Sequence, residues 1–282
     1  VEQGQYQAAV DSFRQGLERD PDNHNAWISL SRALYLAGQP EQAKQGLERV
    51  LSRVPNKVLA IFLLAVMNDG SAEREKAEAL YREVLQIDPE HAGAHFFLAG
   101  RLLQRQAYGA AAKHYAASGS DNPPALLYRL VALYRSGAPD ASVRRELQAD
   151  IARHPELQML KYALTRLLAL SQDPAVRDPS QAVALATELV MGFAIPPYME
   201  ALALAQASAG NFEQAIMLQN QLMSGAAWMG GGPLLEQWQT VLDGFEQGQL
   251  PAEPWPEDDP LLTPQPLDAA AVFREYPSAV PY

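Results

Sequence analysis

The chain has 282 residues, of which 48% are hydrophobic and 20% charged, a composition typical of a folded protein and not of a disordered one. Its formal net charge of −11 argues against nucleic acid and anionic lipid as principal partners, because phosphate binding needs lysine and arginine. The sequence contains no cysteine, which excludes disulfides, thiolate nucleophiles and cysteine-ligated zinc within this chain.

A repeat is visible from the first residues onward. Prolines recur at intervals of 34 residues, and ahead of each stands an alanine followed four residues later by a large apolar side chain. That spacing places the alanine and the large residue on one helix face, and the proline ends the helix. The prolines are Pro21, Pro55, Pro89 and Pro123, preceded by Ala9 and Phe13, Ala43 and Leu47, Ala77 and Tyr81, and Ala111 and Tyr115.

The other half of the unit is equally clear. Residues 27–31 (Trp-Ile-Ser-Leu-Ser) and the turn at 38–40 (Gly-Gln-Pro) indicate one helix, a tight turn and a second helix. In this respect the chain resembles the tetratricopeptide repeat family, with its Trp-x2-Leu-Gly motif, later Ala-x3-Phe and closing proline. The resemblance implies an all-α, right-handed superhelical solenoid of antiparallel helix pairs, whose first helices line a concave groove.

The expected elements follow in chain order. Residues 1–23 are the second helix of a truncated repeat, and the array is expected to extend to residue 249 with a degenerate middle at about 118–195. After residues 230–232 (three glycines), apolar residues at helical spacing predict a capping helix at about 233–247. The predicted units between these limits are 24–57, 58–91, 92–123, 124–157, 158–194 and 196–224.

Residues 250–282 form an acidic, proline-rich tail. Eight prolines and six acidic residues against one arginine predict an extended segment, with a short helix at 267–275. We expect this tail either to fill the groove of its own chain, to dock on a neighbouring subunit, or to cover one end of the solenoid. The residues expected to dock it are Trp255, Phe273, Tyr276 and Tyr282, with Leu261 and Leu262 as further anchors.

The family resemblance also predicts which side chains line the groove. The fifth residues of successive units form an apolar, partly aromatic column that suits apolar side chains of a ligand. They stand where the family's clamp for a C-terminal carboxylate has lysine and asparagine, which argues against that ligand. The alternative is that these rings pack between helices. The predicted groove residues are Asn25, Ile28, Arg32, Tyr35, Phe62, Phe96, Leu103, Tyr128 and Arg135.

Catalytic and metal sites are not expected. His91 and His95 have the i, i+4 spacing of helical metal ligands, but His91 falls in a loop and no third ligand follows. The glycines at 230–232 precede a helix but lack the lysine and the preceding strand of a phosphate loop. The longest apolar run, residues 58–67, is about half of the ~20 residues that a spanning helix needs. No cofactor is predicted.

The sequence therefore predicts a protein-interaction scaffold that binds another polypeptide, within a larger complex. Its acidity favours a basic partner. The alternative is the targeting arm of an enzyme whose catalytic domain lies upstream of Val1, because the chain begins inside a repeat. Its composition, rich in alanine, leucine and glutamine, suggests a bacterial periplasm or cell envelope.

Overall fold

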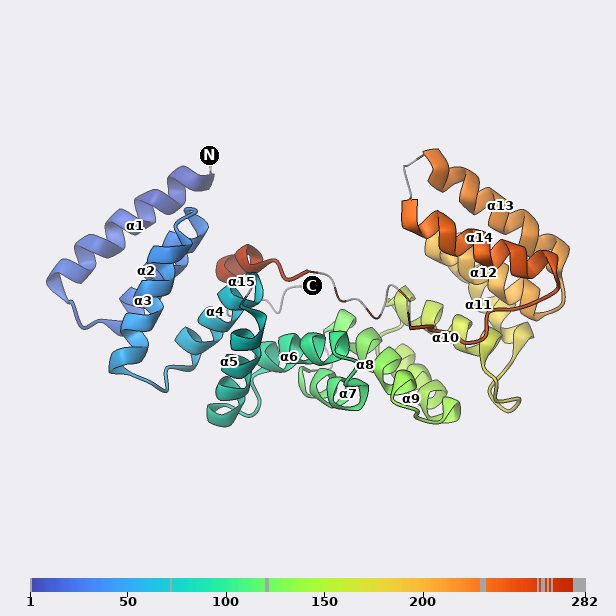
Figure 1. Cartoon of the computed structure of the whole chain (residues 1–282), viewed down its shortest axis with the longest axis horizontal. Coiled ribbons are helices and arrows are strands. Elements are labelled where there is room, and N and C mark those ends of the chain that lie inside the picture. Colours follow the sequence, from blue (N-terminus) through green and yellow to red (C-terminus); the bar gives the residue numbers. More distant parts are fainter. Residues whose placement is uncertain are drawn as a thin grey trace. The chain divides into compact units, whose positions relative to one another are not determined.

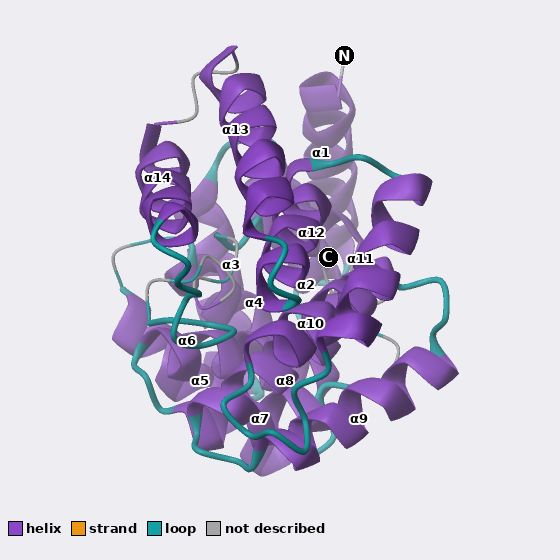
Figure 2. Cartoon of the chain, turned by 90° about the vertical axis from the view of Figure 1, so that its right-hand side faces the viewer, coloured by secondary structure: helices purple, strands orange, loops and turns teal. Residues whose placement is uncertain are grey.

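The computed structural model describes residues 2–71, 73–119, 122–228, 232–257, 259, 262, 264 and 266–275, and these residues form helices and loops without a strand (Figures 1 and 2). None of the described helices is long and apolar enough to cross a membrane. The helices are α1 (Glu2–Arg19), α2 (His24–Leu36), α3 (Pro40–Arg53), α4 (Val58–Asp69), α5 (Arg74–Ile87), α6 (Ala92–Gln104), α7 (Tyr108–Ala117), α8 (Pro123–Arg135), α9 (Asp140–Arg153), α10 (Gln158–Leu170), α11 (Pro179–Gly192), α12 (Pro196–Ser208), α13 (Phe212–Trp228), α14 (Gly232–Glu246) and α15 (Ala269–Glu275).

The chain folds into two compact units. Unit 1 comprises Val1–Ala125 together with Thr263–Tyr282, and unit 2 comprises Leu126–Leu262. The predicted helix pairs are present in both, with α2, α4, α6, α8, α10 and α12 as first helices and α3, α5, α7, α9, α11 and α13 as second helices. The C-terminal segment is divided between the units, where the sequence predicted one continuous array followed by a tail.

The α2–α3 pair shows how the sequence builds a repeat. The Asn23 side chain caps α2 by accepting a hydrogen bond from the Ala26 amide at 3.0 Å. Gly38, at φ +80°, makes the turn, and Pro40 begins the second helix, where a missing N–H costs nothing. A Cβ built on Gly46 would lie 2.2 Å from the Ser31 hydroxyl oxygen, so the glycine permits this close packing of α3 on α2.

The repeated alanine and large apolar residue form the core of unit 1. Ala77 and Tyr81 are fully buried on α5, and Ala111 and Tyr115 take the same places on α7. Helix α4 is apolar nearly all round because α3, α5 and α15 all contact it. The apolar run at 58–67 thus belongs to a largely buried helix.

In unit 2 the expected degenerate region keeps regular helix pairs. Arg129 of α8 joins the pair to α9 through ion pairs with Glu146 and with the buried Asp150. Helix α10 is buried from residue 162 to 170, and it contacts α9, α11 and α12. At the end of the array α14 packs on α13, where the Gln219 amide donates to the Trp238 carbonyl at 3.0 Å.

Candidate functional site

The predicted groove residues of α2 divide into two sets. Asn25 is exposed, and Arg32 and Tyr35 are half-buried on the same side of the helix. Ile28 is only 3% exposed and lies in the core. Its neighbour Ser29 is half-buried and lies four residues after Asn25, on the open side of the helix.

Two further predicted groove residues also belong to the interior of unit 1. Phe62 is 2% exposed, and its ring lies 4.6 Å from the His91 ring and 6.1 Å from that of Phe97. Leu103 is likewise 2% exposed. These side chains fill the space between helices and are not available to a partner, which is the alternative that the sequence left open. Phe96 stays half-buried, with its ring edge toward Tyr115.

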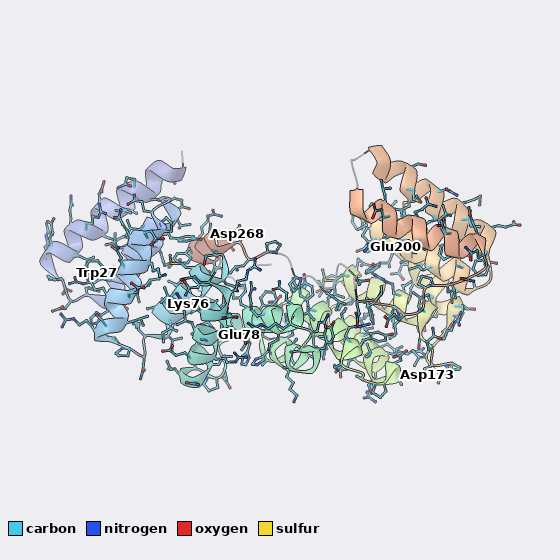
Figure 3. All side chains as sticks on the ribbon, in the orientation of Figure 1. Trp27, Lys76, Glu78, Asp173, Glu200 and Asp268 are labelled. Atoms are coloured by element: carbon cyan, nitrogen blue, oxygen red, sulfur yellow. The ribbon has the colours of Figure 1, made fainter. Side chains whose placement is uncertain are left out.

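Helix α15 lies on the first helices of unit 1, against α2 and α4. The Phe273 ring is fully buried and stacks on Tyr35 with centroids 4.2 Å apart. The Arg32 guanidinium donates to the Phe273 carbonyl oxygen at 2.9 Å. Asp268, labelled in Figure 3, caps the short helix by accepting from the Ala271 amide.

Two glycines of unit 1 lie next to this segment. A Cβ built on Gly70 would lie 3.6 Å from the Ala269 methyl group, and one on Gly100 would lie 3.9 Å from the Pro264 ring. We call the surface made by Arg32, Tyr35, Gly70 and Gly100 the first-helix face of unit 1. It combines a cation, an aromatic ring and two glycines that a Cβ would bring into ordinary contact with the segment.

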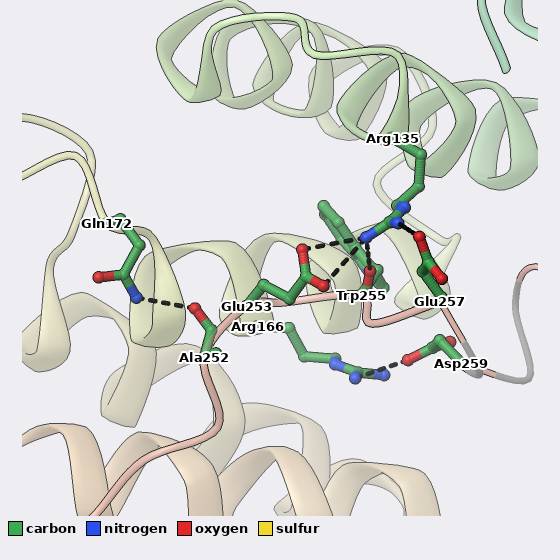
Figure 4. A network of polar contacts seen from close by, with 8 residues as sticks. All are labelled: Arg135, Arg166, Gln172, Ala252, Glu253, Trp255, Glu257 and Asp259. Carbon is green, nitrogen blue, oxygen red and sulfur yellow. Dashed lines mark hydrogen bonds and ion pairs between the residues drawn. The ribbon is translucent and has the colours of Figure 1, made fainter.

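In unit 2 the segment after α14 lies on α8 and α10 (Figure 4). Gly248, at φ +68°, ends the turn after α14. Trp255 is fully buried and meets the Tyr134 ring edge-on, with centroids 5.1 Å apart. Gln172 donates to the Ala252 carbonyl oxygen at 2.8 Å, which holds the beginning of the segment.

Arg135, a predicted groove residue, holds three groups of this segment. Its guanidinium contacts the carboxylates of Glu253 and Glu257, each at 3.0 Å, and donates to the Trp255 carbonyl oxygen at 3.3 Å. Burial, followed by the charge of Glu253, raises the pKa of the neighbouring Tyr134 to about 12. Tyr134 is therefore a neutral donor at physiological pH.

A second arginine holds the end of the segment. Arg166 and Asp259 form an ion pair at 2.7 Å, with side chains only 8% and 2% exposed. The same guanidinium donates to the Tyr162 hydroxyl at 2.9 Å. Glu200 of α12 also interacts electrostatically with Arg166, and burial raises the pKa of this carboxyl group. We call the surface made by Tyr134, Arg135, Arg166 and Gln172 the first-helix face of unit 2.

Tyr134, Arg166 and Gln172 were not predicted from the sequence. Arg166 did carry a signal, since a charged residue with apolar neighbours in the middle of α10 is rarely buried without a partner. Of the other predicted residues, Tyr128 is half-buried on α8. Tyr276, Tyr282 and Leu261, together with Gly230 and Gly231, lie outside the described residues.

The two histidines considered as metal ligands have other partners. His91 caps α6 by accepting a hydrogen bond from the Ala94 amide at 3.1 Å. His95 pairs with His114 of α7, with their Nδ1 atoms 2.8 Å apart. Among the described residues, no group of three metal-ligating side chains comes together.

Comparisons with known proteins agree with this architecture. The family model of the tetratricopeptide repeat matches residues 1–62. An uncharacterized protein of Sinorhizobium fredii, y4yS, is 34% identical over 100 residues, which cover 33% of this chain and 55% of that protein. The chain thus matches about half the length of this curated relative.

Two solved structures share the fold. PilW, a type IV pilus biogenesis factor, matches with a TM-score of 0.55 and 18% identity over 78% of this chain and 98% of PilW. A tetratricopeptide repeat protein from Parabacteroides merdae matches with a TM-score of 0.50 and 17% identity over 86% and 93% of the two chains. Together with the repeats described above, the family model over residues 1–62 and these two structures show that the chain has the tetratricopeptide repeat fold.

Proposed function

We propose that this protein is a scaffold that binds a partner polypeptide along the first-helix faces of its two units, as part of a larger complex. The fold is that of protein-interaction scaffolds. Stacked helix pairs expose long surfaces built from neighbouring repeats, which suit the recognition of an extended chain.

The main support for the proposal is that side chains of both faces donate hydrogen bonds to the backbone of the C-terminal segment. In unit 1, Arg32 donates to the carbonyl oxygen of Phe273, and in unit 2, Arg135 donates to that of Trp255. Each arginine stands beside a tyrosine that packs on the aromatic ring of the same residue. Each face thus pairs a backbone donor with an aromatic contact, which is what binding of a polypeptide segment with an aromatic anchor requires.

Site-specific photo-crosslinking in the source cells tests the proposal. A photoreactive phenylalanine analogue is placed at Asn25 or Tyr128, which lie on first helices. Matched controls carry it at Glu48 and Glu83, exposed positions on second helices. We expect discrete polypeptide adducts from the first-helix positions and few from the controls. Equal adduct yields at all four positions would contradict a first-helix binding face.

A further inference from the structure

We infer that the segment described at residues 251–257 and 259 is a displaceable ligand of unit 2, and that the first-helix face of unit 2 recognises partner segments of the same chemistry: extended, acidic and centred on a buried aromatic side chain. This rests on the proposed function and specifies its ligand. It also replaces the basic partner that the overall charge favoured, because the charges that line this face are arginines.

The way the segment is attached resembles that of a bound peptide. Among the described residues, its backbone-to-backbone hydrogen bonds are local: the Asp259 amide donates to the Pro256 carbonyl oxygen, and the Leu262 amide donates to the Asp259 carbonyl oxygen. Contacts with the rest of unit 2 come instead from side chains, such as those of Gln172 in the loop after α10 and Arg135 of α8, which donate to the carbonyl oxygens of Ala252 and Trp255. The helices of unit 2 thus complete their own backbone pairing without it.

The segment presents a defined pattern to the face. Trp255 is the fully buried anchor, while Glu253 and Glu257, two residues before and after it, meet the same arginine. Asp259, four residues after the anchor, meets Arg166. An acid at positions −2, +2 and +4 relative to an aromatic residue is therefore the pattern that a competing partner needs.

The prolines on both sides of the anchor favour docking in this form. Pro254 and Pro256 restrict the backbone around Trp255 before it binds, so less conformational entropy is lost on docking. A tethered segment competes at an effective concentration on the order of millimolar. A partner therefore binds well only if the docking of the tethered segment is weakened, or if the partner makes more contacts with the face than the segment does.

The test uses the full chain and a fluorescent synthetic peptide with the sequence of residues 250–260. In Trp255→Ala the tethered segment loses its anchor, so the peptide should bind this variant at least ~10-fold more tightly than it binds the wild type. Adding Arg135→Gln should weaken peptide binding ~10-fold or more, as should replacing the peptide's tryptophan by alanine. Fluorescence anisotropy gives these affinities, and added salt should lower them.

Three results would overturn the inference. One is the absence of peptide binding to a folded Trp255→Ala chain, and another is equal binding to wild type and variant. The third is a loss of helix content in Trp255→Ala, because a displaceable ligand is not needed for folding.

The double variant Glu253→Gln with Glu257→Gln keeps the Trp255 anchor but weakens the docking of the segment. It should therefore also raise the affinity for the peptide. Adducts at Asn25 and Tyr128 that persist despite failed peptide binding would leave the proposed function standing.

Discussion

Replacing Trp255 measures how strongly the C-terminal segment docks on unit 2. A tryptophan buries about 150–250 Å², and at about 25 cal/mol per Å² its removal forfeits roughly 4–6 kcal/mol of burial. Large-to-small changes of this type cost about 3–5 kcal/mol in folded cores. If the segment is displaceable, as we propose, it detaches when its anchor is lost. The measured loss in Trp255→Ala is therefore limited to the docking free energy of the segment and should lie below that range.

Trp255→Phe separates the ring from the indole N–H. The indole nitrogen of Trp255 has no acceptor among the described residues, so phenylalanine gives up no hydrogen bond and keeps an edge contact with Tyr134. We expect a smaller loss than for Trp255→Ala, because the phenylalanine ring still fills most of the site and leaves a smaller cavity. The matched control is Trp27→Phe in unit 1, which removes a hydrogen bond to the Pro21 carbonyl at 2.9 Å and weakens the contact with Arg49. That variant should cost about 1 kcal/mol more.

Urea unfolding followed by circular dichroism gives these values. Because the chain forms two compact units, the curves are fitted with one transition for each unit. The Trp255 variants should shift the unit 2 transition and Trp27→Phe that of unit 1. A Trp255→Phe chain that loses as much stability as Trp255→Ala would refute the reasoning, since the indole N–H would then be an essential donor.

Three further predictions concern other parts of the structure. Ala269→Arg should detach α15, because the Ala269 methyl group lies against Gly70; limited proteolysis should then cut this segment faster than in the control Ala270→Arg. Asp259→Asn leaves Arg166 with Tyr162 and Glu200 as partners, so the loss of stability should be smaller than the ~3–5 kcal/mol expected for a buried charge without any partner. A double-mutant cycle with Arg166→Met should show a coupling energy of about 1 kcal/mol or more. Burial and the neighbouring His95 lower the pKa of His114, so the unfolded chain takes up this proton at higher pH than the folded chain, and stability falls as the pH drops below about 6.5. The measurement is the free energy of unfolding at pH 8 and at pH 5. Its decrease between the two should be smaller in His114→Asn than in the wild type and than in the control His24→Gln.

The sequence was informative wherever structure depends on local spacing. The proline interval gave the repeats, and the alanine–aromatic pairs such as Ala77 and Tyr81 gave the core of the second helices. The short helix expected at 267–275 is present as α15. These features depend on neighbouring residues within one repeat or one turn, so their periodicity is visible in a single sequence.

Contacts between distant segments were less predictable. Projection by a fixed offset placed Phe62 in a groove, whereas it packs with Phe97 and His91 in the core. Arg166 stood out as a charge among apolar residues, but its partner Asp259 is 93 residues away in a proline-rich segment without periodicity. Such pairing depends on the path of the tail over the folded helices, which no local pattern specifies.

The central claim is that the first-helix faces hold polypeptide reversibly, with the chain's own C-terminal segment as the occupant. Because the sequence has no cysteine, single cysteines can report opening of the folded chain by thiol labelling. We predict that Ala269→Cys and Pro254→Cys, buried in the segment, label at least ~10-fold faster than Ala60→Cys and Ala203→Cys, buried in α4 and α12. Equal, slow labelling at all four positions would mean that the segment opens only when its unit unfolds, which would contradict the claim.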